Sequence, residues 1–233
     1  MNIENAIHPD IEMLQVVAKA LGSLRDKVVF VGGATTTLYI DDRAAPSSVA
    51  TLDIDCVIEL SNILSMRELE KQLRSRGFTQ PVDEEDPPIC RWALGEIIVD
   101  IMPSDSKFLG FTNLWYKDGI ENREAKKLPD GSEIFIFSIP FFVASKIEAV
   151  KNRGGNDLRL SHDFEDIVLV LSGASNAKTP LLNSPVKLKS YLKYEFAELA
   201  KNSLFSEAVE GILAVRNEDS NRARRVIELI QTY

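Results

Sequence analysis

The sequence is poor in the residues that metal and nucleophilic sites most often use. Among its 233 residues are only 2 cysteines and 2 histidines. Cys56 and Cys90 stand beside apolar residues and form neither a C-x-x-C pair nor a Cys/His cluster with zinc spacing. This scarcity gives no support to zinc binding or to histidine-based triad chemistry. We interpret the cysteines as reduced core residues of a cytosolic protein.

The chain also lacks an excess of positive charge and any long apolar run. Because its formal net charge is −8, no global positive field draws it onto long stretches of nucleic acid, and any such contact must be local. The N-terminal residues lack the apolar core of a signal peptide, and no later segment reaches the roughly 18 apolar residues of a membrane span. We therefore expect a soluble, cytoplasmic protein with no cleaved leader and no membrane contact.

What is present is enough apolar material for two lobes, since 45% of the residues are hydrophobic. Apolar runs and period-two alternation predict strands at residues 27–31, 52–60, 89–93, 96–102 and 133–139. Helical spacing predicts helices at 10–25, 34–40 and 65–76, and the polar segment 41–50 predicts an exposed loop.

After Pro140 the apolar spacing is helical throughout. It predicts helices at 141–152, 157–171, 185–200, 204–215 and 221–232, with a polar linker at 172–184. We therefore predict an α/β domain over residues 1–139, followed by a helical domain over residues 140–233.

Three acidic residues stand inside two of the predicted strands. Asp53 and Asp55 alternate with apolar neighbours, so both carboxylates share one face, with their bases about 6–7 Å apart. Asp100 lies within the apolar run Ile97–Ile101, where a carboxylate would be costly to bury without a cation. Nucleotidyl transfer uses two divalent ions, and Mg²⁺ prefers carboxylate oxygens. The pattern predicts a Mg²⁺ site formed by Asp53, Asp55 and Asp100.

A glycine pair and a later lysine add groups suited to phosphate. Gly32 and Gly33 close a predicted strand and open a predicted helix, where backbone N–H groups can approach phosphate without interference from a Cβ. Thr35 brings a hydroxyl beside this turn. Lys146 stands on an otherwise apolar helix start, and we expect it to reach the triphosphate and close the cleft between the lobes.

Together these features resemble the DNA polymerase β-like nucleotidyltransferases and, within them, the AbiEii/MenT-like toxin nucleotidyltransferases. The resemblance covers residues 28–170 and rests on Gly32-Gly33, Thr51–Asp55, Val99–Ile101, Lys146 and His162–Asp166. It implies an α/β (α+β) fold in which a mixed-sheet lobe precedes a helical-bundle lobe, with the active site in the cleft between them.

The resemblance also implies roles for residues. Asp53, Asp55 and Asp100 would hold Mg²⁺, with Asp100 assisting deprotonation of the acceptor.

The nucleotide site implied by the resemblance would comprise Gly32, Gly33, Thr35, Lys146 and Asp166. Lys146 would also act catalytically by stabilising the departing phosphates. Asp163 could instead take the role in the nucleotide site that we assign to Asp166.

The activity implied is Mg²⁺-dependent transfer of a nucleoside monophosphate from an NTP to a hydroxyl acceptor. In known toxins of this group the acceptor is tRNA, and an antitoxin protein is usually encoded nearby. The sequence leaves other functions open: transfer to an aminoglycoside-like small molecule, transfer to a protein, or NTP binding without catalysis. The basic run Arg222–Arg225 is interpreted as a solvated helix face, and it is the only compact basic patch available to RNA.

Structural alternatives also stay open for the acidic strands. Asp53 and Asp55 could be solvent-facing residues of an edge strand, and Asp100 could pair with Arg91 across the predicted hairpin. The threonines after the glycine turn could serve only helix initiation and packing.

The helical residues have structural alternatives of the same kind. Lys146 could be a solvated lysine paired with Glu148. Asp163 could be a helix-start residue near the positive end of the helix dipole, and Asp166 could pair with Arg159 or Lys146.

Overall fold

The computed structural model describes residues 7–42, 44–45, 48–81, 88–108, 110, 112–153, 157–214 and 220–233. The chain forms two compact units, Met1–Thr35 with Val49–Phe137 and Thr36–Ser48 with Ser138–Tyr233. The predicted domain limits, 1–139 and 140–233, stay a prediction. Within the described residues, no helix combines the length and apolar character needed to cross a membrane.

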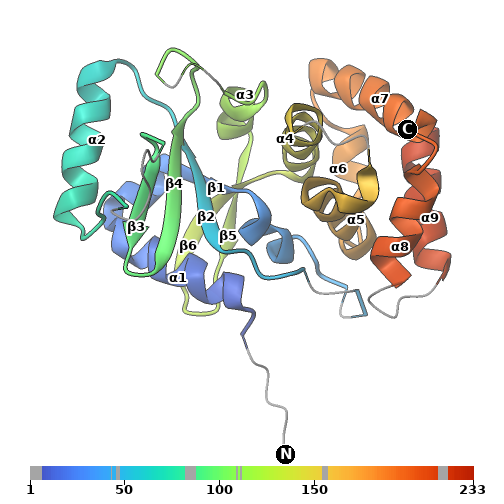
Figure 1. Ribbon diagram of the computed structural model, residues 1–233, viewed down its shortest axis with the longest axis horizontal. Coiled ribbons are helices and arrows are strands. Elements are labelled where there is room, and N and C mark those ends of the chain that lie inside the picture. Colours follow the sequence, from blue (N-terminus) through green and yellow to red (C-terminus); the bar gives the residue numbers. More distant parts are fainter. Residues whose placement is uncertain are drawn as a thin grey trace, which may run out of the picture. The chain divides into compact units, whose positions relative to one another are not determined.

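A six-stranded mixed sheet forms the frame of the first unit (Figure 1), in the order β3-β4-β2-β1-β6-β5. Its strands are β1 (Val28–Val31), β2 (Asp53–Ile58), β3 (Arg91–Leu94), β4 (Ile97–Pro103), β5 (Arg123–Lys127) and β6 (Glu133–Phe137). β2 pairs antiparallel with β1 and parallel with β4, so it lies inside the sheet. β3 and β4 form the predicted hairpin, with Gly95 in the left-handed region at φ 61°.

The helical elements that accompany the sheet are α1 (Pro9–Leu21), the 3₁₀ helix η1 (Gly22–Lys27), α2 (Ile63–Ser75) and α3 (Tyr116–Glu121). α1 buries Leu14, Val17 and Leu21 along one face, as its predicted spacing requires. α2 begins with a capping box between Asn62 and Ser65.

The predicted helix at 34–40 is a short 3₁₀ helix, η2 (Gly33–Leu38), instead of an α-helix. Three consecutive threonines lower helix propensity because branching at Cβ restricts their side chains.

The sequence patterns missed α3 and β5. In β5 four of five residues are exposed and the segment has no apolar alternation, because it lies at the edge of the sheet and pairs only with β6. The Arg123 guanidinium stacks on the Phe135 ring, 4.6 Å from its centroid. Such a strand depends on cross-strand contacts that local periodicity does not reveal.

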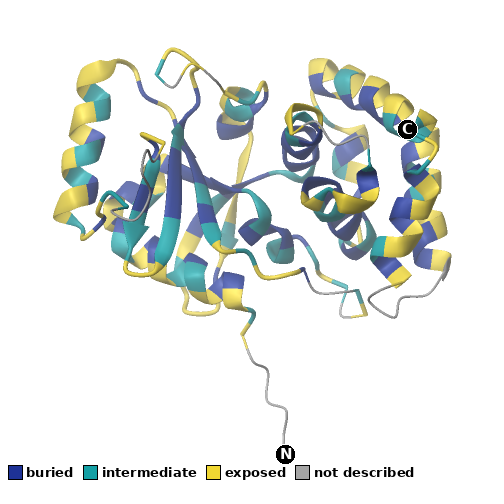
Figure 2. Cartoon of the chain, viewed as in Figure 1, coloured by how far each residue is buried: buried dark blue, intermediate teal, exposed yellow. Residues whose placement is uncertain are grey.

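The second unit is helical. Its elements are α4 (Ile139–Asn152), the 3₁₀ helix η3 (Leu158–Leu160), α5 (His162–Gly173), α6 (Lys178–Leu182), α7 (Val186–Lys201), α8 (Phe205–Ala214) and α9 (Ser220–Thr232). Figure 2 shows buried residues concentrated in α4 and α5, whereas α7 and α9 alternate buried and exposed positions. The predicted linker at 172–184 was wrong in part, because it contains α6. The predicted helix end at Val215 lies outside the described residues.

The segment Thr36–Ser48 belongs to this helical unit. The Tyr39 ring lies 4.7 Å from that of Phe142, and the amides of Asp41 and Asp42 both donate to the carbonyl of Gly173. The predicted loop at 41–50 is confirmed in its described residues, of which Asp41, Ala44, Val49 and Ala50 are exposed and Ser48 is buried. Its first residues hydrogen-bond to the end of α5.

Candidate active site

Asp53, Asp55 and Asp100 lie on one face of two adjacent strands. Asp55 and Asp100 are register partners in the parallel pair β2–β4, and Asp53 is opposite Ile98. Register partners project to the same side of a sheet, and Asp53 shares the face of Asp55 by alternation. Because β2 is an interior strand, the alternative of an edge strand for Asp53 and Asp55 was wrong.

Gly32 makes room for the Asp55 carboxylate. It ends β1 with φ 75°, a conformation that side chains rarely adopt. A Cβ at this position would collide with Asp55 Oδ2 and lie 3.0 Å from Asp55 Cγ. The glycine is thus required twice, by the turn and by the neighbouring acid. Gly33, the next residue, is half-buried at the start of η2.

Asp53 is held by Thr51, which begins the motif Thr51–Asp55 but was not predicted as a site residue. The Thr51 hydroxyl donates to Asp53 Oδ1 at 2.7 Å, and the Thr51 amide donates to Asp10 Oδ1 at 2.9 Å. Asp10 is fully buried at the start of α1. These bonds link α1 to the acidic face, and only the proximity of Thr51 to Asp53 in sequence could have indicated them.

Asp100 forms a two-pronged ion pair with Arg91. Arg91 Nε lies 3.0 Å from Asp100 Oδ1, and Arg91 Nη2 lies 2.9 Å from Asp100 Oδ2. This is the geometry in which a guanidinium and a carboxylate fit best. The pairing across the hairpin is therefore confirmed. In this arrangement no group of three His, Cys, Asp or Glu side chains among the described residues is disposed to hold a metal ion.

Lys146 forms a buried cluster in the second unit. Its Nζ lies 2.6 Å from Asp166 Oδ2 and 3.0 Å from Asp163 Oδ1. Arg153 also binds Asp163, at 2.7 Å, and the Thr36 hydroxyl donates to Asp166 Oδ1 at 2.9 Å. The cluster joins α4, α5 and the segment Thr36–Ser48 within one unit.

The position of Lys146 excludes one alternative and supports another. Its side chain is only 10% exposed, so the solvated lysine paired with Glu148 was wrong, whereas the pairing of Asp166 with Lys146 is confirmed. Burial opposes the charge of Lys146, but Asp166 and Asp163 outweigh it and raise its pKa. Lys146 is therefore a cation whose charge two carboxylates already balance.

A solved structure resembles most of the chain. It is the crystal structure of an antigenic nucleotidyltransferase-like protein from Paracoccidioides brasiliensis, which aligns with a TM-score of 0.54 over 86% of this chain and 92% of that chain, at 21% sequence identity. The fold is nucleotidyltransferase-like. No family model and no curated protein matches the sequence. The likeness is one of fold, and the toxin subfamily stays a prediction.

In this nucleotidyltransferase-like fold the predicted site residues form two groups. Gly32, Gly33, Thr35, Asp53, Asp55 and Asp100 belong to the first unit, and Lys146, Asp163 and Asp166 belong to the second. Thr35 is fully buried, and its hydroxyl donates to the Gly32 carbonyl at 2.9 Å. That bond stabilises the turn.

The thiols of Cys56 and Cys90 have raised pKa values, partly because Asp55 and Asp100 lie nearby. Burial, Asp55 and Asp100 raise the pKa of the Cys56 thiol well above its ordinary value. Burial and then Asp100 raise the pKa of Cys90 to about 11. Both thiols are free, buried and protonated at neutral pH, in agreement with their interpretation as reduced core residues.

Proposed function

We propose that this protein is a Mg²⁺-dependent nucleotidyltransferase that moves a nucleoside monophosphate from an NTP onto a hydroxyl acceptor. The observation that carries the proposal is the shared face of Asp53, Asp55 and Asp100 on β2 and β4, beside a glycine that has no room for a Cβ. The nucleotidyltransferase-like fold supports it.

The acidic face suits a magnesium ion in its chemistry. Asp53 and Asp55 are half-buried oxygen donors on one strand face, and hard cations prefer such ligands. Asp100 would complete the set by releasing Arg91, which lies beside it in β3. Mg²⁺ bound there would supply positive charge to the α-phosphate and to the departing pyrophosphate.

The transfer makes and breaks one bond at phosphorus. The acceptor oxygen bonds to the α-phosphorus of the NTP, the bond from that phosphorus to the bridging oxygen of the β-phosphate breaks, and pyrophosphate leaves. Asp100 would assist removal of the hydroxyl proton. Gly32, Gly33 and Thr35 would form the turn that meets the nucleotide.

Lys146 and Asp166 would complete the nucleotide site, with Lys146 stabilising the departing phosphates. Because Asp163 and Asp166 already bind Lys146, this role requires the lysine to exchange a carboxylate for phosphate.

We further propose tRNA as the acceptor and a toxin-antitoxin pair as the setting, on the resemblance of the motifs to toxin nucleotidyltransferases. Small-molecule and protein acceptors are the alternatives within the same reaction class. NTP binding without catalysis is a second candidate, and the bidentate Arg91–Asp100 pair favours it, because that pair occupies both oxygens of the third acid.

A labelling experiment tests the proposal. Incubation of the full chain with each labelled NTP, Mg²⁺ and total tRNA should label the RNA, and Asp53→Ala should abolish labelling. Asp26→Ala, which removes a carboxylate with a 70% exposed side chain elsewhere in the same unit, is the matched control and should leave labelling unchanged. Absence of labelled RNA, protein or small molecule with every NTP would contradict the enzymatic proposal.

Arg91 and Asp100 variants separate a metal ligand from a structural ion pair. Asp100→Asn should reduce Mg²⁺-dependent labelling as severely as Asp53→Ala, whereas Arg91→Met should retain it. If both variants lose activity to the same extent, the activity depends on the Arg91–Asp100 ion pair and not on Asp100 as a metal ligand. Binding of Mg²⁺-NTP by the wild type without release of pyrophosphate would instead favour the non-catalytic candidate.

A further inference from the structure

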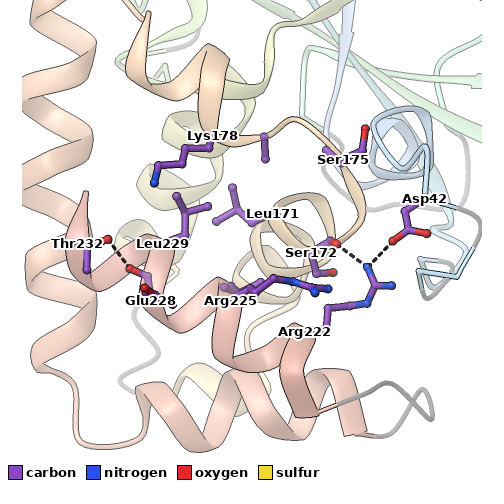
Figure 3. A pocket seen from close by; sticks show the side chains of 13 residues that line it. Asp42, Leu171, Ser172, Ser175, Lys178, Arg222, Arg225, Glu228, Leu229 and Thr232 are labelled. Carbon is purple, nitrogen blue, oxygen red and sulfur yellow. Dashed lines mark hydrogen bonds and ion pairs between the residues drawn. The ribbon is translucent and has the colours of Figure 1, made fainter.

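A hollow of about 570 Å³ lies within the helical unit (Figure 3). Asp42, the end of α5, the start of α6 and most of the length of α9 surround it. This volume falls in the range of small-molecule sites. Its lining includes the apolar side chains of Leu171, Val226 and Leu229. None of the residues that line the hollow is assigned to the proposed transferase site.

One end of the hollow is built around a buried arginine. Arg222 is only 6% exposed, so the prediction that Arg222–Arg225 is a solvated helix face was wrong for this residue. Its Nη1 donates to the Ser172 carbonyl at 2.7 Å and lies 2.9 Å from Asp42 Oδ2. Asp42 Oδ1 accepts from the Ala44 amide at 2.9 Å. Both oxygens of Asp42 are thus engaged.

Arg225 approaches this end of the hollow from the next turn of α9, and Figure 3 shows its side chain running toward Ser172 and Arg222. The bond from Ala44, the pair with Arg222 and the charge of Arg225 together lower the pKa of Asp42. Arg225 is therefore within electrostatic range of a carboxylate whose oxygens already serve other donors. Among the described residues, Arg225 has no hydrogen bond or ion pair of its own.

A second cation lines the same hollow. Lys178 is exposed at the start of α6, and within the described part of the chain its Nζ likewise has no hydrogen bond or ion pair. Glu228 is the other acidic lining residue besides Asp42. With Asp42 and Arg222 neutralising each other, two cations face one acid in a chain whose formal net charge is −8.

We infer that this hollow binds a small phosphate monoester, with Arg225 and Lys178 holding the phosphate and Leu171 and Leu229 packing against an apolar body. A guanidinium presents paired donors to phosphate oxygens, and lysine adds a point charge. A phosphate monoester carries a charge of about −1.5 to −2 at pH 7, so it matches two cations that lack a partner in the described part of the chain better than a carboxylate does. The inference is independent of the proposed transferase activity.

Titration calorimetry on the full chain tests the inference, with butyl phosphate, inorganic phosphate and butyrate as probes. Butyl phosphate should bind saturably and most tightly, inorganic phosphate more weakly, and butyrate weakest. Arg225→Gln and Lys178→Gln should each weaken butyl phosphate binding by about tenfold or more, as expected for loss of a charged hydrogen-bond partner. Both side chains are exposed, so neither variant should change the unfolding temperature.

Arg224→Gln is the matched control, since Arg224 is the exposed neighbour of Arg225 on α9 and does not line the hollow. It should bind butyl phosphate like the wild type, and so should Asp53→Ala. Equal weakening by Arg224→Gln would indicate general surface charge, and equal weakening by Asp53→Ala would indicate binding at the acidic face. Either result, absence of saturable binding, or butyrate binding as tightly as butyl phosphate would overturn the inference.

Discussion

The carboxylates of the two units are compensated in different ways. In the helical unit Asp163 and Asp166 share the ammonium of Lys146, and Asp163 also binds Arg153. In the sheet unit the Asp53 carboxylate accepts a hydrogen bond from the neutral Thr51 hydroxyl, and Asp100 forms an ion pair with Arg91. Burial raises the pKa of Cys56, and the negative charges of Asp55 and Asp100 raise it further.

The difference separates acids that hold a fold together from acids that can serve chemistry. Carboxylates fully matched by cations lose stability when a partner is removed, because a buried charge is left alone. Acids gathered on one face repel one another, and a bound cation relieves that repulsion. Substitutions in the helical cluster should therefore lower stability, besides any effect on the nucleotide-binding role proposed for Lys146 and Asp166, whereas those on the acidic face should mainly affect activity.

The largest effect is expected for Lys146→Met. It removes the shared cation from the buried Asp163, which keeps Arg153, and from the half-buried Asp166, so the free energy of unfolding should fall by about 3–5 kcal/mol. Urea denaturation followed by circular dichroism measures the loss. Lys193→Met, at an exposed position of α7, is the control and should change stability by no more than about 0.5 kcal/mol. Equal stability of Lys146→Met and Lys193→Met would show that the Lys146 cluster does not stabilise the helical unit.

Gly32→Ala should have the next largest effect. The methyl group would meet the Asp55 carboxylate, so the variant should lose about 1–3 kcal/mol beyond the cost of left-handed backbone. Gly95→Ala measures that backbone cost alone, because Gly95 has φ 61° and nothing within 4 Å of an added Cβ. Comparable unfolding free energies for the two variants would mean that Asp55 moves aside freely.

Thr51→Val should alter activity more than stability. Loss of the hydroxyl that holds Asp53 should cost about 1 kcal/mol of stability and about tenfold in Mg²⁺-dependent labelling. Thr112→Val is the control, since its hydroxyl bonds the Ser104 carbonyl at 3.2 Å in the same unit. A Thr51→Val protein with full activity would show that the hydroxyl does not position Asp53 for function.

The smallest effect concerns alkaline pH. The pKa of Cys90 rises from 9.0 to about 11 on folding, so its contribution to stability is complete below pH 9 and lost as pH increases toward 11. Between pH 7.5 and 9.5 this loss should not exceed about 1 kcal/mol. Cys90→Ala should therefore lose less stability over that interval than the wild type. Identical losses would indicate that folding does not raise the pKa of this thiol.

The sequence predicted the sheet where alternation was clear. Strand β2 and the β3–β4 hairpin were predicted because apolar residues alternate there with acids or flank a glycine turn. β5 was not predicted, since its residues are charged and exposed. The helix type of η2 could not be predicted, because its three threonines have low helix propensity and tertiary packing decides the conformation.

The sequence predicted which residues carry the chemical groups of the site, but not which residues pair with them. The acidic face follows from the period of a strand, whereas the Arg91–Asp100 pair was only one of two alternatives. The bonds of Thr36 to Asp166 and of Arg222 to Asp42 join positions far apart in the chain. No local pattern encodes such pairs, because they depend on how distant segments meet.

The segment Thr36–Ser48 gives the helical unit an unusual dependence on the order of synthesis. It supplies Thr36 to Asp166, Asp42 to Arg222, and Ile40, which lies where a Cβ on Gly173 would collide. A ribosome makes this piece about a hundred residues before the helices that need it. During synthesis this segment therefore leaves the ribosome before its partners in α5 and α9. A fragment that begins at Ser138 would lack it altogether and leave the end of α5 bare.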